Sequence, residues 1–292
     1  MNELFKQDAI KENSMKIGVL SDLHIDTNRK KLKENETYAG ILIKQIKHQK
    51  IDVLLLAGDI SSDYLESQNF LDEVTQKSGI PILFVPGNHD FWSIKNGETD
   101  TKKIYQFFKN QPNNLVDQPY ILNDDWAIVG NPGWYDYGYG DQSKYTEEEF
   151  NEMKLRFGVW QDKRYVHWGK ENKQVAQWML GQLESDLQSV GERKIILMTH
   201  VVTHPRFVVP LPHKIYDYFN AFLGSSSYEK LYQKYPIAYS VMGHVHFRKT
   251  LVDNQINYIC ACLGGSKHWL TKDPEAEIVN ALLTFHLPEK KR

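Results

Sequence analysis

Five short runs rich in isoleucine, valine and leucine constrain the fold of this 292-residue chain more than any other feature. The runs occupy residues 16–20, 51–57, 80–85, 194–198 and 237–242. Runs of this length and composition are typical of buried β-strands. Apolar residues at helical spacing over 37–48 and 64–74 separate the first three runs. This alternation of strand and helix predicts an α/β domain whose sheet is at least partly parallel.

Pairs of apolar segments joined by polar turns follow from about residue 115 onward. The two pairs are 120–122 with 126–129, and 249–252 with 256–262. Each pair predicts a β-hairpin, and residues 278–286 predict a closing strand. We therefore expect an α/β sandwich with a mixed sheet, formed by a single domain over residues 15–287.

An aromatic-rich insert at about residues 133–168 interrupts this pattern. Its aromatic residues include Trp134, Tyr135, Tyr137, Tyr139, Tyr145, Trp160, Tyr165 and Trp168. The segment is too long for a plain connection, so we expect an elaborated loop with a helix near residues 147–155. Two roles stay open for the aromatic side chains: they could stack on a planar part of a substrate, or they could form a small hydrophobic core of the insert.

Composition limits the partners and the location of the chain. Its 35 lysine and arginine residues nearly balance 37 aspartate and glutamate residues, so nucleic acid and anionic membranes are not expected partners. Residues 1–14 form a polar extension without the apolar core of a signal peptide, and we expect it to be disordered. Met15 is an alternative start to Met1, because the first apolar run begins there.

No apolar stretch reaches the length of about 18 residues that a transmembrane helix requires, and we expect a cytoplasmic protein.

Cys260 and Cys262 are separated by one residue. A disulfide across that spacing would be strained, so we expect two reduced, buried thiols in a core strand.

Each of the five apolar runs ends at residues that can bind a metal ion. In chain order these residues are Asp22, His24, Asp59, Asn88, His200, His244 and His246. Ligands collect at the carboxyl ends of strands in open α/β sheets. Oxygen donors mixed with imidazoles suit manganese, iron or zinc, and the lack of thiolates argues against a structural zinc site. Seven ligands exceed the needs of one ion, so we expect two divalent ions about 3.5–4 Å apart, bridged by one carboxylate.

The ordered motifs resemble those of the calcineurin-like metallophosphoesterases. The matching motifs are Asp22-x-His24, Gly58-Asp59, Gly87-Asn88-His89-Asp90, His200 and Gly243-His244-x-His246. The resemblance covers about residues 16–246 and, through the closing strands, most of the chain. It implies a four-layer sandwich of two mixed β-sheets flanked by helices, with a dinuclear metal centre along one edge.

The resemblance also implies a role for each residue of the motifs. Asp22, His24 and His246 would hold the first metal. Asn88, His200 and His244 would hold the second metal. Asp59 would bridge the two ions, and His89 would be the catalytic residue that contacts the phosphate and protonates the leaving oxygen.

We expect a metal-dependent phosphoester hydrolase, most consistent with a phosphodiesterase that acts on a small molecule. The Asn88-His89-Asp90 version of the motif is closer to the branch that contains cyclic-nucleotide and other small phosphodiesterases. A phosphomonoesterase is the alternative within enzymes, and a non-catalytic scaffold of the same fold is the alternative from another class. Two nearby residues keep open roles: Asp90 either orients a catalytic group or caps the next segment, and His204 either reaches phosphate or packs in a loop.

Overall fold

The computed structural model describes residues 14–287, so the extension predicted over residues 1–14 lies, except for Ser14, outside the described part. The first sheet has four strands, in the order β12 (Leu283–His286), β1 (Lys16–Leu20), β2 (Val53–Leu56) and β3 (Ile82–Phe84). β1 and β3 both pair in parallel with β2, whereas β12 runs antiparallel to β1. These parallel strands confirm the first three predicted runs. The predicted helices also form, as α2 (Tyr38–Gln49) and α3 (Tyr64–Ser78).

The second sheet has six strands and contains the two remaining predicted runs. Its order is β10 (Arg248–Asp253), β11 (Ile256–Ala261), β9 (Ile237–Met242), β8 (Lys194–Thr199), β5 (Trp126–Asn131) and β4 (Tyr120–Ile121). The four central strands are parallel, and the edge strands β10 and β4 each pair antiparallel with their neighbour. Both predicted hairpins are therefore confirmed, and each supplies one edge of a mixed sheet.

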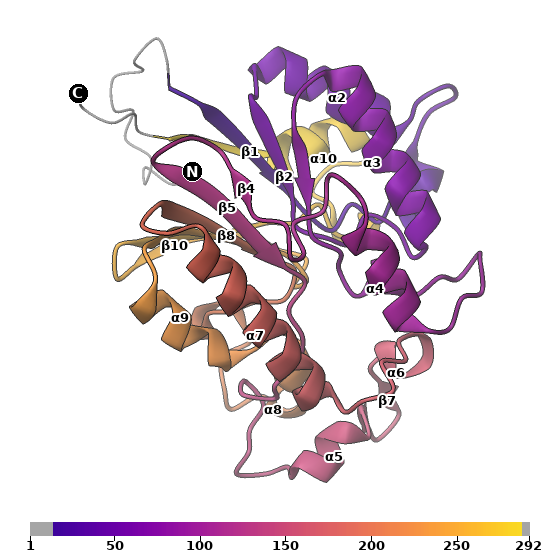
Figure 1. Ribbon diagram of the computed structural model, residues 1–292. Helices are drawn as coiled ribbons and strands as arrows, with labels where there is room; N and C mark the ends of the chain where they lie inside the picture. Colours follow the sequence, from indigo (N-terminus) through magenta and orange to yellow (C-terminus); the bar gives the residue numbers. More distant parts are fainter. Residues whose placement is uncertain (1–13, 288–292) are drawn as a thin grey trace.

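The two sheets pack face to face, and helices cover both outer faces (Figure 1). Apolar side chains such as Val19, Leu55, Ile196 and Val241 fill the space between the sheets. The outer face of the first sheet is covered by α2, α3 and α10 (Pro274–Ala281). The outer face of the second is covered by α7 (Asn172–Ser189) and α9 (Glu229–Lys234). The protein therefore has the four-layer sandwich that the family resemblance implies.

The predicted closing strand over residues 278–286 is wrong in its first half. Residues up to Ala281 belong to α10, and the strand β12 begins only at Leu283. Asp273 accepts a hydrogen bond from the backbone of Ala276, and Pro274 occupies the first turn, so the segment begins with two strong helix-start signals. The apolar pattern of a short segment does not by itself distinguish a buried helix from a strand.

The insert folds into short elements rather than one long helix. They are α5 (Glu147–Asn151), β6 (Lys154–Leu155), β7 (Gly158–Val159) and α6 (Asp162–Tyr165). A capping box between Thr146 and Glu149 begins α5 as the predicted helix, but that helix ends earlier than predicted, before the hairpin of β6 and β7. Trp134, Tyr135 and Tyr137 are almost completely buried. Of the two roles left open for these three residues, the structure shows the hydrophobic core.

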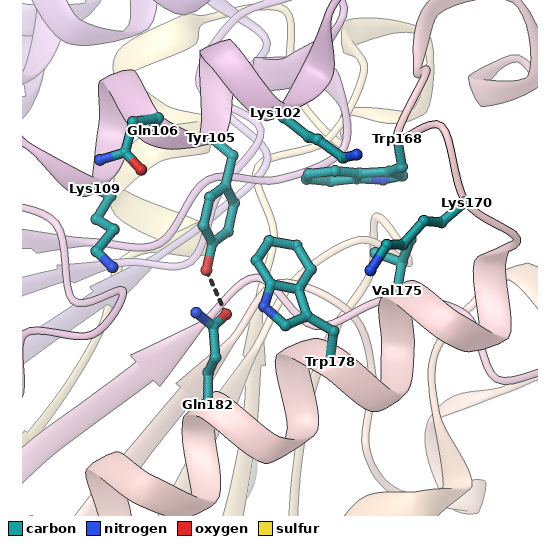
Figure 2. A pocket seen from close by; sticks show the side chains of 9 residues that line it. All are labelled: Lys102, Tyr105, Gln106, Lys109, Trp168, Lys170, Val175, Trp178 and Gln182. Carbon is teal, nitrogen blue, oxygen red and sulfur yellow. Dashed lines mark hydrogen bonds between the residues drawn. The ribbon is translucent and has the colours of Figure 1, made fainter.

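The C-terminal end of the insert is anchored between α4 (Thr101–Lys109) and α7. The ring centroids of Trp168 and Trp178 lie 6.0 Å apart. The Tyr105 hydroxyl donates a hydrogen bond to Gln182 Oε1 at 2.8 Å, which joins α4 to α7 (Figure 2). These side chains line a pocket of about 250 Å³ whose rim carries the lysines Lys102, Lys109 and Lys170. None of the seven predicted metal ligands lines this pocket, so it does not belong to the predicted metal centre.

Cys260 and Cys262 are buried free thiols, as predicted, with their sulfur atoms 3.4 Å apart.

Within residues 14–287, no helix combines the length and apolar character needed to cross a bilayer.

Candidate metal centre

The loops that follow five parallel strands meet at one edge of the sandwich, and backbone hydrogen bonds join them. The loop after β1 is bound to the loop after β2 because the backbone N–H of Asp22 donates to Gly58 at 2.9 Å. The loop after β9 is bound to the loop after β8 because Gly243 donates to His200 at 2.9 Å. Residues more than 200 positions apart in the sequence, such as Asp22 and His246, therefore lie in one cluster.

All seven predicted ligands come together, in two groups that share one carboxylate. Among the described residues, the first possible metal-binding group is Asp22, His24, Asp59 and His246, and the second is Asp59, His200 and His244. The donor atoms within each group lie within 4.8 Å of one another. Asn88 joins the second group, because its Oδ1 lies 3.0 Å from His200 Nε2 and 2.9 Å from His244 Nδ1.

The first group opens to solvent on one side. His24 Nε2 lies 2.9 Å from His246 Nε2 and 3.7 Å from Asp59 Oδ2, while His246 Nε2 lies 3.3 Å from Asp22 Oδ1. Asp22, His24 and Asp59 are buried, whereas the His246 side chain is 37% exposed. A substrate could therefore reach this group from the His246 side.

The second group is held by hydrogen bonds that determine which ring nitrogen carries the proton. His200 Nδ1 lies 2.8 Å from the Ala57 carbonyl, and His244 Nε2 lies 2.9 Å from the Phe222 carbonyl. A carbonyl oxygen can only accept, so these two nitrogens donate and the opposite nitrogens keep their lone pairs. His200 Nε2 and His244 Nδ1 therefore both face the cluster as electron-pair donors. Outer hydrogen bonds of this kind are typical of histidines that bind metals.

Asn88 is oriented by a residue that the sequence did not indicate. Its Nδ2 donates to both carboxylate oxygens of Asp162, at 2.9 and 3.1 Å. The amide oxygen of Asn88 therefore faces His200 and His244. Three lone-pair atoms converge here with no proton between them, an arrangement that a cation would stabilise. Asp162 lies 74 residues beyond Asn88 and belongs to no recognised motif, so no signal in the sequence pointed to it.

Burial changes the pKa of the buried histidines and of the shared carboxylate in opposite directions. Burial, and then the charge of a neighbouring imidazole, lowers the pKa of both His24 and His244 to about 3, so both rings are neutral and able to bind a metal. Burial, and then the charge of Asp22, raises the pKa of Asp59 well above its ordinary value. Neutral imidazoles next to two closely spaced carboxyl groups, those of Asp22 and Asp59, are ligands that suit a metal cation.

The backbone around the cluster adopts conformations that cost energy. Five of the seven predicted ligands have positive φ angles: Asp22 at 54°, His24 at 42°, Asp59 at 56°, His244 at 74° and His246 at 56°. Left-handed conformations of non-glycine residues cost roughly 1–3 kcal/mol each and gather at functional sites. Gly87 permits a further close approach, since a Cβ atom there would lie 2.1 Å from Asp59 Oδ1.

His89 lies beside the first group. Its ring centroid is 4.7 Å from that of His24, and its backbone N–H donates to Asp59 Oδ1 at 2.9 Å. The ring stacks on Trp92 at 3.6 Å, and Nδ1 lies 3.3 Å from the Ser62 hydroxyl. Burial, followed by the charge of His24, lowers the pKa of His89 well below its ordinary value. The ring is therefore held next to the cluster without being part of either group.

Comparison with known proteins identifies the family. The family model for calcineurin-like phosphoesterases matches residues 15–248. The chain belongs to the calcineurin-like phosphoesterase family. Members of this family use divalent metal ions in a dinuclear centre, which agrees with the two groups of donors that the structure brings together.

Individual relatives of this chain are distant. A probable cyclic nucleotide phosphodiesterase from Vesicomyosocius okutanii is 36% identical over 74 residues, which are 24% of this chain and 31% of the relative. The chain spans about a third of the length of the curated relatives it matches.

Solved structures support the fold. The phosphopantetheinyl hydrolase of Mycobacterium tuberculosis aligns with a TM-score of 0.70 at 17% identity, covering 96% of this chain and 98% of that one. A dimetal phosphatase from Danio rerio aligns with a TM-score of 0.50 at 14% identity, covering 84% and 86%. Both likenesses concern the fold alone, because sequence identity is low.

The structure places two residues whose roles were left open. Asp90 is completely buried and accepts hydrogen bonds from the backbone of Asp59 at 2.8 Å and of Gly87 at 2.7 Å. It therefore joins the loops that carry Asp59 and Asn88. His204 does not join the cluster; it pairs with Asp253 at 3.2 Å and accepts from the Arg206 backbone.

Proposed function

We propose that this chain hydrolyses phosphodiester bonds of a small-molecule substrate at a dinuclear metal centre. The observation that carries the proposal is the division of seven donors into two groups that share Asp59. Asp22, His24 and His246 would hold the first ion, Asn88, His200 and His244 would hold the second, and Asp59 would bridge them. The donor types suit manganese, iron or zinc. When bound, two such ions lower the pKa of a water molecule and offset the negative charge that develops on phosphate.

The protein's own residues would prepare the site for this chemistry. The carbonyls of Ala57 and Phe222 hold His200 and His244 in the tautomers that expose a lone pair to the cluster. The backbone N–H of His89 donates to Asp59 Oδ1 and leaves Oδ2 facing His24. Because these bonds fix the orientation of the donors, the donors would need little rearrangement to bind the ions.

His89 would act as the general acid. It lies next to the first group but outside both groups, and its ring is held by Trp92 and Ser62. In that position an imidazole could donate a proton to the departing alkoxide, which is worth about 10²–10⁴ in rate. Its pKa would have to rise in the complex with an anionic substrate, because a negative phosphate favours the protonated ring.

Two observations support a diester substrate. The name of the Vesicomyosocius okutanii relative describes a cyclic nucleotide phosphodiesterase, an enzyme that acts on a diester. In this chain, Trp92 stacks on Tyr165 with ring centroids 4.6 Å apart, and both rings are half-buried. This partly exposed aromatic surface adjoins His89, so it could receive an apolar or planar group attached to the phosphate.

The experiment compares a diester with a monoester that has the same leaving group. Metal-free protein is reconstituted separately with manganese, iron(II) and zinc, and assayed on bis-p-nitrophenyl phosphate and p-nitrophenyl phosphate. We expect a higher kcat/KM for the diester with at least one metal. His246→Ala is the control, because loss of a ligand should abolish metal-dependent turnover. A preference for the monoester would refute the diester proposal, and inactivity of every loaded form on both substrates would favour the scaffold alternative.

A second experiment tests His89. We expect His89→Asn to bind two metal ions normally and to lose much more activity on a dialkyl phosphodiester, whose leaving group is an alkoxide, than on bis-p-nitrophenyl phosphate, which releases p-nitrophenolate. A good leaving group hardly needs a proton, so the difference reports proton donation. Loss of a metal ion, or equal losses on both reactions, would remove His89 from the role of general acid.

A further inference from the structure

Asp162 lies where the aromatic insert meets the metal cluster. Its side chain is almost completely buried and accepts hydrogen bonds from four neighbours: Asn88, Trp92, Tyr135 and Trp160. Asn88 and Trp92 follow β3, whereas Tyr135 and Trp160 belong to the insert. One carboxylate therefore joins the insert to the loop that carries a predicted metal ligand.

None of the four partners of Asp162 carries a positive charge. The indole N–H groups of Trp92 and Trp160 donate at 2.6 and 2.7 Å, and the Tyr135 hydroxyl donates at 2.7 Å. Burial, and then the charge of Asp162, raises the pKa of Tyr135 well above its ordinary value, so Tyr135 stays a neutral donor. A buried carboxylate is costly unless a positive charge balances it. The neighbouring group of Asn88, His200 and His244 is where the proposed second ion would supply that charge.

The contact with Asn88 has a direct consequence for metal binding. An asparagine amide can present either its oxygen or its nitrogen, and only the oxygen has a lone pair to give to a cation. Asp162 accepts from Nδ2 with both of its oxygens, which selects the orientation with Oδ1 toward His200 and His244. The reverse orientation would place the amide oxygen against a carboxylate and the amide hydrogens against two imidazole lone pairs.

We infer that Asp162 is a positioning residue for the second metal site, and that the insert uses it to complete the centre. It presents the amide oxygen of Asn88 to the ion and supplies a negative charge behind that ligand. The same carboxylate holds the indole of Trp92, on which His89 stacks. This inference rests on the proposed metal centre and deepens it, because it assigns a role to a residue outside both groups of ligands.

The test measures metal binding rather than turnover. Manganese(II) is titrated into metal-free wild-type and Asp162→Asn protein, and binding is followed by electron paramagnetic resonance, which distinguishes single ions from a spin-coupled pair. In Asp162→Asn, we expect the affinity of one site to fall about 10- to 100-fold, as for other partners of metal ligands, with the other site little changed. The coupled signal should then appear only at higher manganese concentrations.

Tyr135→Phe is the matched control, because it removes one donor to the same carboxylate but keeps the charge and the bond to Asn88. We expect it to bind both ions with little change. Equal losses in Tyr135→Phe and Asp162→Asn would overturn the inference and assign Asp162 to packing of the insert. Unchanged affinities in Asp162→Asn would also overturn it, as would equal weakening of both sites.

A reciprocal exchange keeps the test decisive if Asp162→Asn folds poorly. Asn88→Asp alone would place two carboxylates in direct contact, whereas the double variant Asn88→Asp with Asp162→Asn restores an amide-to-carboxylate bond with the donor and acceptor exchanged. We expect the double variant to bind the second manganese ion more tightly than Asn88→Asp does; failure of this rescue would overturn the inference. Wild-type protein that binds fewer than two ions would instead refute the proposed metal centre itself.

Discussion

The hydrogen bonds of Asp90 allow a prediction of stability that is independent of catalysis. One carboxylate oxygen accepts hydrogen bonds from the backbone N–H groups of Asp59 and Gly87. The other accepts from the backbone N–H groups of Ile60 and Ser61 and from the Ser67 hydroxyl. Asp90→Asn keeps the shape of the side chain but turns one oxygen into an NH₂ group. At least two buried donors then lose their acceptor in either amide orientation. At roughly 1–3 kcal/mol for each unsatisfied buried donor, the variant should lose about 2–6 kcal/mol of unfolding free energy.

Urea unfolding of metal-free protein at about pH 8 measures this loss. Burial raises the pKa of Asp90 to about 6, so the wild-type group is a carboxylate under these conditions. Ser67→Ala is the matched control, because it removes one donor and leaves the acceptor intact, and it should cost only about 1–2 kcal/mol. An Asp90→Asn protein within about 1 kcal/mol of the wild type would refute the reasoning that Asp90 holds the two ligand loops together.

Three further predictions concern the shared carboxylate, the insert and a buried acid distant from the centre. Asp59→Asn should lose at least one metal ion, measured by elemental analysis after gel filtration, and more activity than a change of any other single ligand, because Asp59 belongs to both groups. Tyr137→Ala should cost about 3–5 kcal/mol in urea unfolding, because the ring is buried, and should lower turnover of bulky and minimal esters alike; a selective rise in KM for the bulky ester would favour substrate stacking. Burial, and then the charge of Asp117, raises the pKa of Asp186 to about 7. The folded state therefore keeps this proton to higher pH than the unfolded chain does, and stability falls between about pH 4 and pH 7. Asp186→Asn should be roughly 1–2 kcal/mol more stable than the wild type at pH 8 and little different near pH 4, after allowance for solvent screening, as measured by urea unfolding at both pH values.

The parallel strands and the predicted ligands could be read from the sequence because both signals are local. A buried strand needs a continuous apolar run, and the ligand follows directly where the run ends, as Asp59 follows β2 and His200 follows β8. The order of the motifs then led to the family and to the four-layer fold. A local signal can also mislead. The sequence predicted a strand where the end of helix α10 lies, because the apolar residues of a short segment fit a strand as well as a helix.

Other features arise only when distant parts of the chain pack together. The contact between Asp162 and Asn88 joins residues 74 positions apart, and nothing near either residue in the sequence indicates it. The same is true of the tautomers of His200 and His244, which depend on carbonyls from other loops. The aromatic composition of the insert was visible, but burial of Trp134 and Tyr137 was decided by packing against the rest of the domain. The sequence by itself therefore determined which residues could bind metal. The tertiary structure decided how each donor is oriented, because orientation depends on hydrogen bonds from residues that are close only in the folded chain.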